Sequence, residues 1–131
     1  AIKVVNQACP LFVPIIEEGL INNSFTMEIA NYYLKKINAS NIDTLILGCT
    51  HYPVMQNVFN KVINKDIYII NSAEATAKYV NQYLLNQNLT IKLKSNNSDQ
   101  YYVSDKPEKF DKLANMFLGI TNINVEHVPF I

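Results

Sequence analysis

Short apolar runs alternate with amphipathic stretches along this chain. Residues 44–47 and 67–70 are apolar and partly β-branched, as strands are, and the first run is expected to be buried on both faces. The same reasoning predicts strands at 3–7, 101–103 and 124–128, and a short edge strand at 91–94. Because the longest apolar runs are far too short to span a bilayer, no membrane partner is expected.

Apolar positions three and four residues apart indicate helices. They are expected at about 25–37, from Pro53 to about Ile63, after Asn71, and between Asp105 and Gly119. Asp105 and Glu108 form a capping-box pattern, and Gly119 can end that helix. Residues 10–18 are expected to form a loop with a single helical turn, because Pro14 interrupts them. Strands that alternate with helices predict an α/β fold with a largely parallel sheet flanked by helices.

Composition narrows the classes of partner. The 131 residues are 49% hydrophobic, which is enough for a core, and their formal net charge is zero. Lysines are scattered and do not form a stripe with aromatic residues, so no nucleic-acid partner is expected. With no secretory signal pattern, a cytoplasmic location is expected. All 11 basic residues are lysines, so an acidic substrate would be held by backbone N–H groups, hydroxyls, amides or lysine rather than by a guanidinium group.

The loop after residues 44–47 concentrates the candidate chemistry. Gly48 lets the backbone turn, and Cys49, Thr50 and His51 then precede the expected helix. This places them at the carboxyl end of a parallel strand, where open α/β sheets bind ligands. A cysteine before a helix ionises more readily, and the thiolate is its reactive form. From position alone, a reactive thiol and a small buried hydrophobe are about equally favoured for Cys49.

The residues after Cys49 add to the candidate chemistry of this loop. His51 could exchange protons with Cys49, and the Thr50 hydroxyl could bind a carboxylate or phosphate oxygen. A zinc site is not favoured, because no second Cys/His cluster has suitable spacing, so no metal is expected. His127 lies near the end of the chain and is expected to be incidental.

Two blocks of sequence resemble the glutamate racemases. Leu45 to Pro53, Leu-Ile-Leu-Gly-Cys-Thr-His-Tyr-Pro, is similar to the C-terminal cysteine motif of that family, and this string is highly specific. Ala8 to Gly19 is similar to the segment that carries a glutamate of the catalytic site. The segments 71–76, 101–105 and 117–120 resemble later junctions, strands and helices with less specificity. The resemblance extends over nearly all of the chain.

The resemblance implies a domain organisation. Racemases of this family are about twice as long, with two similar α/β domains and the active site between them. This chain resembles only the C-terminal half and is expected to be a fragment. By analogy, residues 1–71 would complete the domain that carries the cysteine loop, and residues 72–131 would complete the other. The missing N-terminal half and L- or D-glutamate are then the expected partners, with a homodimer left open.

The resemblance also implies roles for individual residues. Cys49 would be one of two thiols that flank the α-carbon of glutamate, with no cofactor, because inversion requires an acid and a base on opposite faces. His51 would assist the thiol and contact the substrate, and Thr50 would bind the substrate. One acidic residue of the pair Glu17 and Glu18 would lie near the thiol. Glu17 is preferred because it directly follows the Val-Pro-Ile-Ile run, with Glu18 left open.

The resemblance leads to three further expectations, on Cys9, on the activity of the fragment and on alternative functions. Cys9 is interpreted as structural, because the family's other thiol lies in an N-terminal segment that is not part of this chain. A complete enzyme would supply D-glutamate for peptidoglycan, whereas the fragment would be inactive alone. The alternatives are a related racemase for aspartate or another amino acid, and a non-catalytic α/β binding module.

Overall fold

The computed structural model describes residues 1–90, 99–119 and 123–129 of the chain. It forms two compact units, Ala1–Leu89 and Thr90–Ile131, each considered by itself below. The edge strand expected at 91–94 lies outside the described residues. This division reflects contacts within the chain and does not test the domain boundary expected after residue 71, which stays a prediction. Among the described residues, no helix is both long and apolar enough to cross a membrane.

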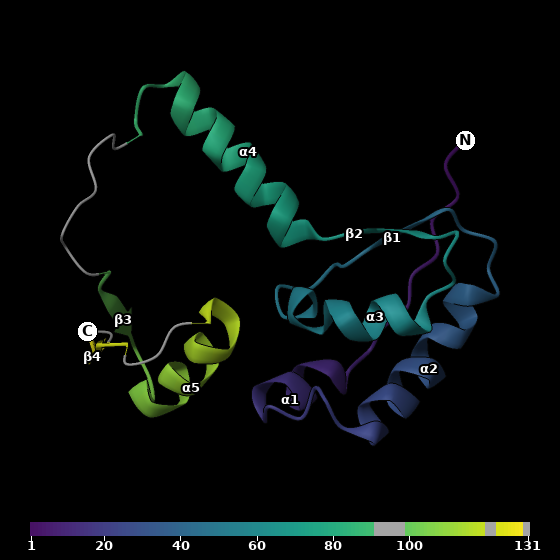
Figure 1. Cartoon of the computed structure of the whole chain (residues 1–131), viewed down its shortest axis with the longest axis horizontal. Helices are drawn as coiled ribbons and strands as arrows, with labels where there is room; N and C mark the ends of the chain where they lie inside the picture. Colours follow the sequence, from purple (N-terminus) through teal and green to yellow (C-terminus); the bar gives the residue numbers. More distant parts are fainter. Residues whose placement is uncertain (91–98, 120–122, 130–131) are drawn as a thin grey trace. The chain divides into compact units, whose positions relative to one another are not determined.

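The first unit pairs two parallel strands with several helices (Figure 1). Its elements are α1 (Phe12–Glu17), α2 (Ser24–Asn38), β1 (Thr44–Ile46), the 3-10 turn η1 (Tyr52–Met55), α3 (Gln56–Val62), β2 (Tyr68–Ile70) and α4 (Ser72–Asn86). β1 and β2 are parallel, with Leu45 opposite Ile69. Together with the parallel pair of the second unit, this confirms the predicted α/β class with parallel strands.

The core of the first unit lies between the helices and one face of the strand pair. Phe12, Met55 and Phe59 are almost fully buried there, and Leu45 and Ile69 pack against them. The opposite face of the strands is open: Ile46 is 64% exposed and Tyr68 is 71% exposed. The expectation that residues 44–47 are buried on both faces was therefore wrong, because helices cover only one face of this two-stranded sheet.

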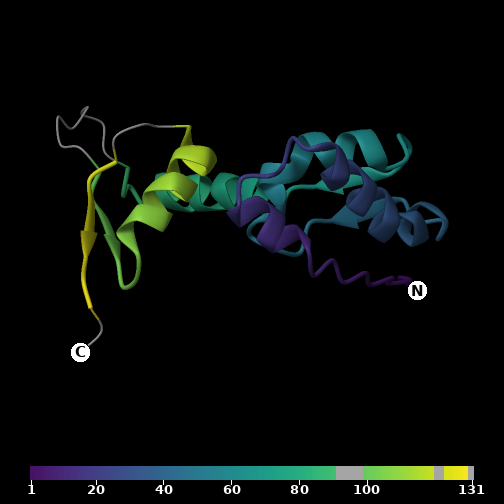
Figure 2. The ribbon, with the colours of Figure 1, turned by 90° about the horizontal axis from the view of Figure 1, so that it is seen from below.

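The N-terminal segment is not a strand. Residues 1–9 have no regular secondary structure, and Figure 2 shows the start of the chain, in purple, as an extended segment. Ile2 is 94% exposed and Val4 is 84% exposed. The strand expected at 3–7 was wrong in this chain because a strand needs a hydrogen-bonded neighbour, and β1 pairs only with β2 in the described sheet.

The segment expected to be a loop contains a real helix. α1 runs from Phe12 to Glu17, with Pro14 at its third position. The first helical N–H groups have no partner within a helix, so a proline there costs no hydrogen bond. Phe12, Ile15 and Ile16 are buried, so tertiary packing holds a helix of only six residues.

Helices α2 and α3 agree with the predicted pattern, and the Asn38 side chain connects the end of α2 to the end of α3. α2 buries Ala30, Leu34 and Ile37. At its last residue, the Asn38 amide donates to the Val62 carbonyl at 2.8 Å, and its oxygen accepts from the Asn64 N–H at 3.1 Å. This side chain therefore satisfies backbone groups at the C-terminal end of α3.

The fourth helix begins as expected but buries little. Asn71 is its N-cap, and its side-chain oxygen accepts from the Glu74 N–H at 3.2 Å. The Ser72 hydroxyl donates to the Leu47 carbonyl at 2.9 Å, which connects the helix start to the end of β1. None of the side chains of α4 is buried, and Tyr79 is 73% exposed.

The second unit contains β3 (Tyr101–Val103), α5 (Pro107–Leu118) and β4 (Val125–His127), and its two strands are parallel. α5 ends at Gly119 in the left-handed conformation, as predicted. The predicted capping box is not formed, because the N-cap is Lys106, one residue after Asp105. Pro107 suits the first helical position and so sets the start of this helix.

Candidate active site

The cysteine loop begins where β1 ends. The Leu47 N–H donates to the Ile70 carbonyl at 3.1 Å, and Leu47 is buried, so the strand is held up to this residue. Gly48 is exposed, and a Cβ atom added to it would meet nothing within 4 Å. Cys49 follows, and its carbonyl accepts from the Tyr52 N–H at 3.1 Å, which closes the turn into η1. Cys49 and Thr50 therefore lie between a fixed strand end and a fixed helical turn.

The imidazole of His51 lies at the centre of the site. Its Nδ1 atom is 3.9 Å from the Cys49 Sγ atom and 3.4 Å from the Thr50 hydroxyl oxygen. Its Nε2 atom is 3.6 Å from the Glu17 Oε1 atom. One ring nitrogen therefore contacts the thiol and hydroxyl of its own loop, while the other contacts a carboxylate from α1.

The contact with Glu17 joins segments that are far apart in the sequence. The His51 side chain is 27% exposed and that of Glu17 is 32% exposed, so both are partly shielded but reachable from solvent. Glu18, by contrast, is exposed and belongs to the C-terminal cap of α1. Of the two acidic residues considered from the sequence, the structure therefore brings Glu17 to the cysteine loop.

This arrangement can move a proton between the thiol and the imidazole. With Nε2–H donating toward the Glu17 carboxylate, Nδ1 carries a lone pair directed at Cys49 and Thr50. The neutral ring can then accept the thiol proton, and the carboxylate stabilises the imidazolium that forms. A reactive group, an imidazole that exchanges a proton with it and a carboxylate that orients the imidazole are a common arrangement in catalytic sites.

Cys9 lies in a different environment from Cys49. It is 6% exposed within the hydrophobic core, and its thiol lies 3.7 Å from the Gln7 carbonyl oxygen. Burial raises the pKa of Cys9 to about 11, so its thiol stays neutral at physiological pH. Cys49 is only partly buried. This supports the interpretation of Cys9 as structural.

The structure adds Tyr52, which was missed from the sequence. Its phenol donates to the Cys9 carbonyl at 3.4 Å, and its ring meets Phe12 edge to face at 5.5 Å between centroids. Burial, followed by the nearby thiols of Cys9 and Cys49 and the phenol of Tyr33, raises the pKa of Tyr52 to about 12. The sequence signal was its place directly after His51, but Phe12 and Cys9 lie 40 and 43 positions earlier.

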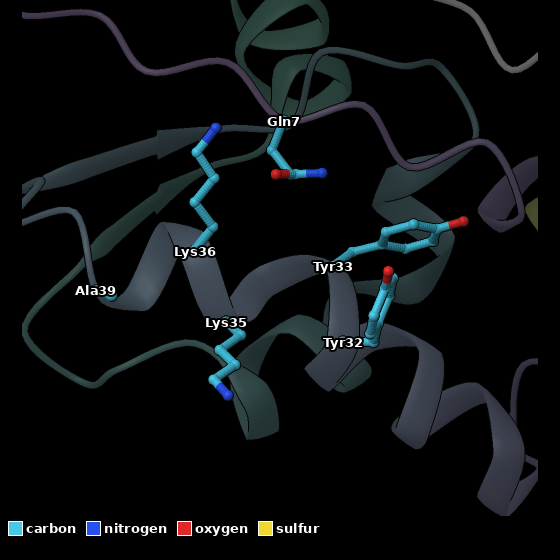
Figure 3. A pocket seen from close by; sticks show the side chains of 6 residues that line it. All are labelled: Gln7, Tyr32, Tyr33, Lys35, Lys36 and Ala39. Atoms are coloured by element: carbon cyan, nitrogen blue, oxygen red, sulfur yellow. The ribbon is translucent and has the colours of Figure 1, made fainter.

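A hollow elsewhere on the first unit is not lined by Cys49, Thr50, His51 or Glu17 (Figure 3). It has a volume of about 470 Å³ and is lined by Gln7, Tyr32, Tyr33, Lys35, Lys36 and Ala39. Figure 3 shows Lys36 extending toward Gln7, whereas Lys35 points the other way. The residues expected to be functional do not line it. Among the described residues, no group of three His, Cys, Asp or Glu side chains is placed to hold a metal ion.

Comparison with known proteins shows which enzymes the chain is similar to. No protein-family model matches it. A glutamate racemase of Chlorobium phaeobacteroides is 43% identical over 97% of this chain, and one of Geobacter metallireducens is 39% identical over 90% of it. This chain is a homologue of the glutamate racemases. The chain spans about half the length of the curated relatives it matches, 47% and 44% in these two cases.

Solved structures of glutamate racemases show the same similarity. The enzyme of Francisella tularensis, solved in complex with D-glutamate, matches with a TM-score of 0.83 at 35% identity. A glutamate racemase of Bacillus anthracis matches with a TM-score of 0.85 at 30% identity. In both, the match covers 97% of this chain and 47% of the solved chain. The resemblance to the C-terminal half of the glutamate racemases is thereby confirmed.

Proposed function

We propose that this chain carries one half of the active site of a glutamate racemase. The observation that supports this most directly is the Glu17–His51–Cys49 arrangement, in a chain that is 43% identical to a curated glutamate racemase over nearly its whole length. A non-catalytic module would not need a partly exposed thiol facing an imidazole that a carboxylate orients.

The proposed reaction uses Cys49 as one of two acid/base groups. As a thiolate, Cys49 removes the α-proton of glutamate from one face, and a thiol from the missing half delivers a proton to the opposite face. In the reverse direction the two groups exchange roles. His51 passes a proton to or from Cys49 through Nδ1, over the 3.9 Å contact, and Glu17 keeps Nε2 protonated and the ring oriented.

Binding of the substrate follows from the side chains at hand. Without arginine in the chain, the carboxylates of glutamate would meet the Thr50 hydroxyl and the backbone N–H groups of the loop. Thr50 is exposed, so its hydroxyl is accessible to a ligand. The opposing thiol and the rest of the pocket come from the N-terminal half, and the complete enzyme supplies D-glutamate for peptidoglycan.

The test measures the circular dichroism of L-glutamate over time. We expect no decay of the signal with this chain alone, and decay once the N-terminal half of a related racemase completes it. In the completed enzyme, Cys49→Ala should lower the rate by at least about 10² to 10⁴. Full activity in Cys49→Ala would refute the proposal. L-Aspartate in the same assay decides between glutamate and aspartate as substrate.

The two acidic residues provide a matched comparison in that assay. Glu17→Gln removes the charge that faces His51 and should lower kcat by about 10- to 100-fold, the value of a hydrogen bond to a charged group. Glu18→Gln removes a neighbouring exposed charge and should change kcat little. Equal effects of the two substitutions would show that the Glu17 contact has no special role.

A further inference from the structure

One carbonyl oxygen connects the two segments that form the site. The Cys9 carbonyl accepts from the Phe12 N–H at 3.1 Å, which opens the first turn of α1. The same oxygen accepts from the Tyr52 phenol at 3.4 Å, and Tyr52 is the first residue of η1. The start of α1 and the start of η1 are therefore tied to one atom.

Packing keeps the Tyr52 ring in this place. Its ring lies 5.5 Å from that of Phe12 at an interplanar angle of 84°, and 6.0 Å from that of Phe59. Phe12 is fully buried and Phe59 is 1% exposed, so neither ring can move aside without opening the core. The pKa of Tyr52 of about 12 keeps the phenol protonated, and therefore a hydrogen-bond donor, throughout the neutral range.

These contacts and the chain between them form a closed cycle that includes the candidate site. From the Cys9 carbonyl, α1 leads over six residues to Glu17, which contacts His51 at 3.6 Å. His51 is bonded to Tyr52 in the chain, and the Tyr52 phenol returns to the Cys9 carbonyl. The segment that begins α1 and the cysteine loop are therefore joined by the Glu17–His51 contact, by the Tyr52–Cys9 hydrogen bond and by the packing of the Tyr52 ring on Phe12.

We propose that Tyr52 is a positioning residue, which holds α1 against the cysteine loop so that the Glu17 carboxylate faces Nε2 of His51. Nδ1 of His51 then faces Cys49. Among the groups that face the imidazole are the Glu17 carboxylate from α1 and the Cys49 thiol and Thr50 hydroxyl from its own loop. The bearing of Tyr52 on catalysis rests on the proposed racemase function, whereas the test below needs no substrate.

The test measures how fast iodoacetamide alkylates Cys49 at a fixed neutral pH. Tryptic cleavage after lysine separates the two cysteines, because Cys49 lies in the peptide 37–61 and Cys9 in the peptide 4–35. Buried Cys9 reports folding, since it becomes reactive only in an unfolded chain. Tyr52→Phe keeps the ring and removes only the hydroxyl group. Tyr33→Phe is the matched control, because its ring packs edge to face on the same Phe12 at 5.3 Å.

We expect Tyr52→Phe to slow alkylation of Cys49 by about two- to tenfold, which corresponds to the loss of one hydrogen bond. Tyr33→Phe should leave the rate unchanged, and Cys9 should stay unmodified in every variant. Glu17→Gln should slow the reaction as well, and Tyr52→Phe should then add nothing in that background, because both act through the same contact.

Two results would overturn the proposal. One is an unchanged rate in Tyr52→Phe while Glu17→Gln is slower. The other is an equal additional effect of Tyr52→Phe in the Glu17→Gln background, which would mean that Tyr52 acts through packing instead. Both results concern thiol reactivity in this chain, so they are distinct from failure of the proposed function, which would appear as full racemisation by the completed Cys49→Ala enzyme.

Discussion

Phe12 is the side chain on which the geometry of α1 depends most. It is fully buried, and its ring meets Tyr33, Tyr52 and Phe59 edge to face at centroid distances of 5.3, 5.5 and 5.7 Å. Such a site has little freedom to collapse around a smaller side chain, since three rings would have to move together. We therefore predict that Phe12→Ala is strongly destabilising.

The expected size follows from what each substitution removes. Replacing a buried Phe by Ala costs about 3–5 kcal/mol in lost transfer free energy and cavity formation. Phe12→Leu retains most of the volume but loses the three aromatic contacts, each worth about 0.5–1.5 kcal/mol beyond buried area, so about 1.5–4.5 kcal/mol is expected. Leu11→Ala is the control next to it, because Leu11 is 48% exposed and should cost less than about 1 kcal/mol.

Urea denaturation followed by far-UV circular dichroism measures these values. For a slope of about 2 kcal/mol per molar urea, Phe12→Ala should lower the midpoint by roughly 2 M and Leu11→Ala by less than about 0.5 M. A loss of less than about 1 kcal/mol in Phe12→Ala would refute the inference that the position of α1 depends on Phe12. It would also remove the physical basis for a fixed contact between Glu17 and His51.

Two further predictions concern stability. Asn38→Ala leaves the Val62 carbonyl without its 2.8 Å partner and should lower the free energy of unfolding by about 1–3 kcal/mol in urea titrations, whereas the exposed Asn31→Ala should change it by less than about 0.5 kcal/mol. Burial raises the pKa of Cys9 from 9.0 to about 11, so its contribution to stability is complete below pH 9 and is lost as the pH rises to 11. In urea titrations from pH 8 to 11, Cys9→Ala should therefore remove about 2–3 kcal/mol of the decline seen in the parent chain, and an equal decline in both would contradict a buried neutral thiol.

Local sequence was sufficient to locate the cysteine loop. A short apolar strand, Gly48, a proline-started turn and an amphipathic helix form a contiguous pattern, and each part depends mainly on its neighbours in the chain. Met55, Val58, Phe59 and Val62, which share the spacing of one helix face, are all buried. The later helices, α2 to α5, could be predicted for the same reason.

Features that depend on distant partners could not be predicted. The segment 3–7 has the composition of a strand, but no strand of the described sheet pairs with it. Pro14 indicated an interruption, yet at the third helical position it costs no hydrogen bond. The partners of Tyr52, namely the Cys9 carbonyl and the Phe12 ring, come from a segment about 40 residues earlier, which no local pattern shows.

The packing of the first unit explains why the contacts among Glu17, His51 and Cys49 can form within this chain alone. α1 and the cysteine loop are held from the inner side of the strand pair, through Phe12 and the helices that cover this side. The outer side leaves Ile46 and Tyr68 mostly exposed, and burying side chains of this size would contribute about 1.5–3 kcal/mol each. The proposed N-terminal half therefore has apolar surface to gain on binding. Because the contacts of His51 with Glu17 and Cys49 already exist within this chain, such binding would need to supply only the opposing thiol and the rest of the pocket.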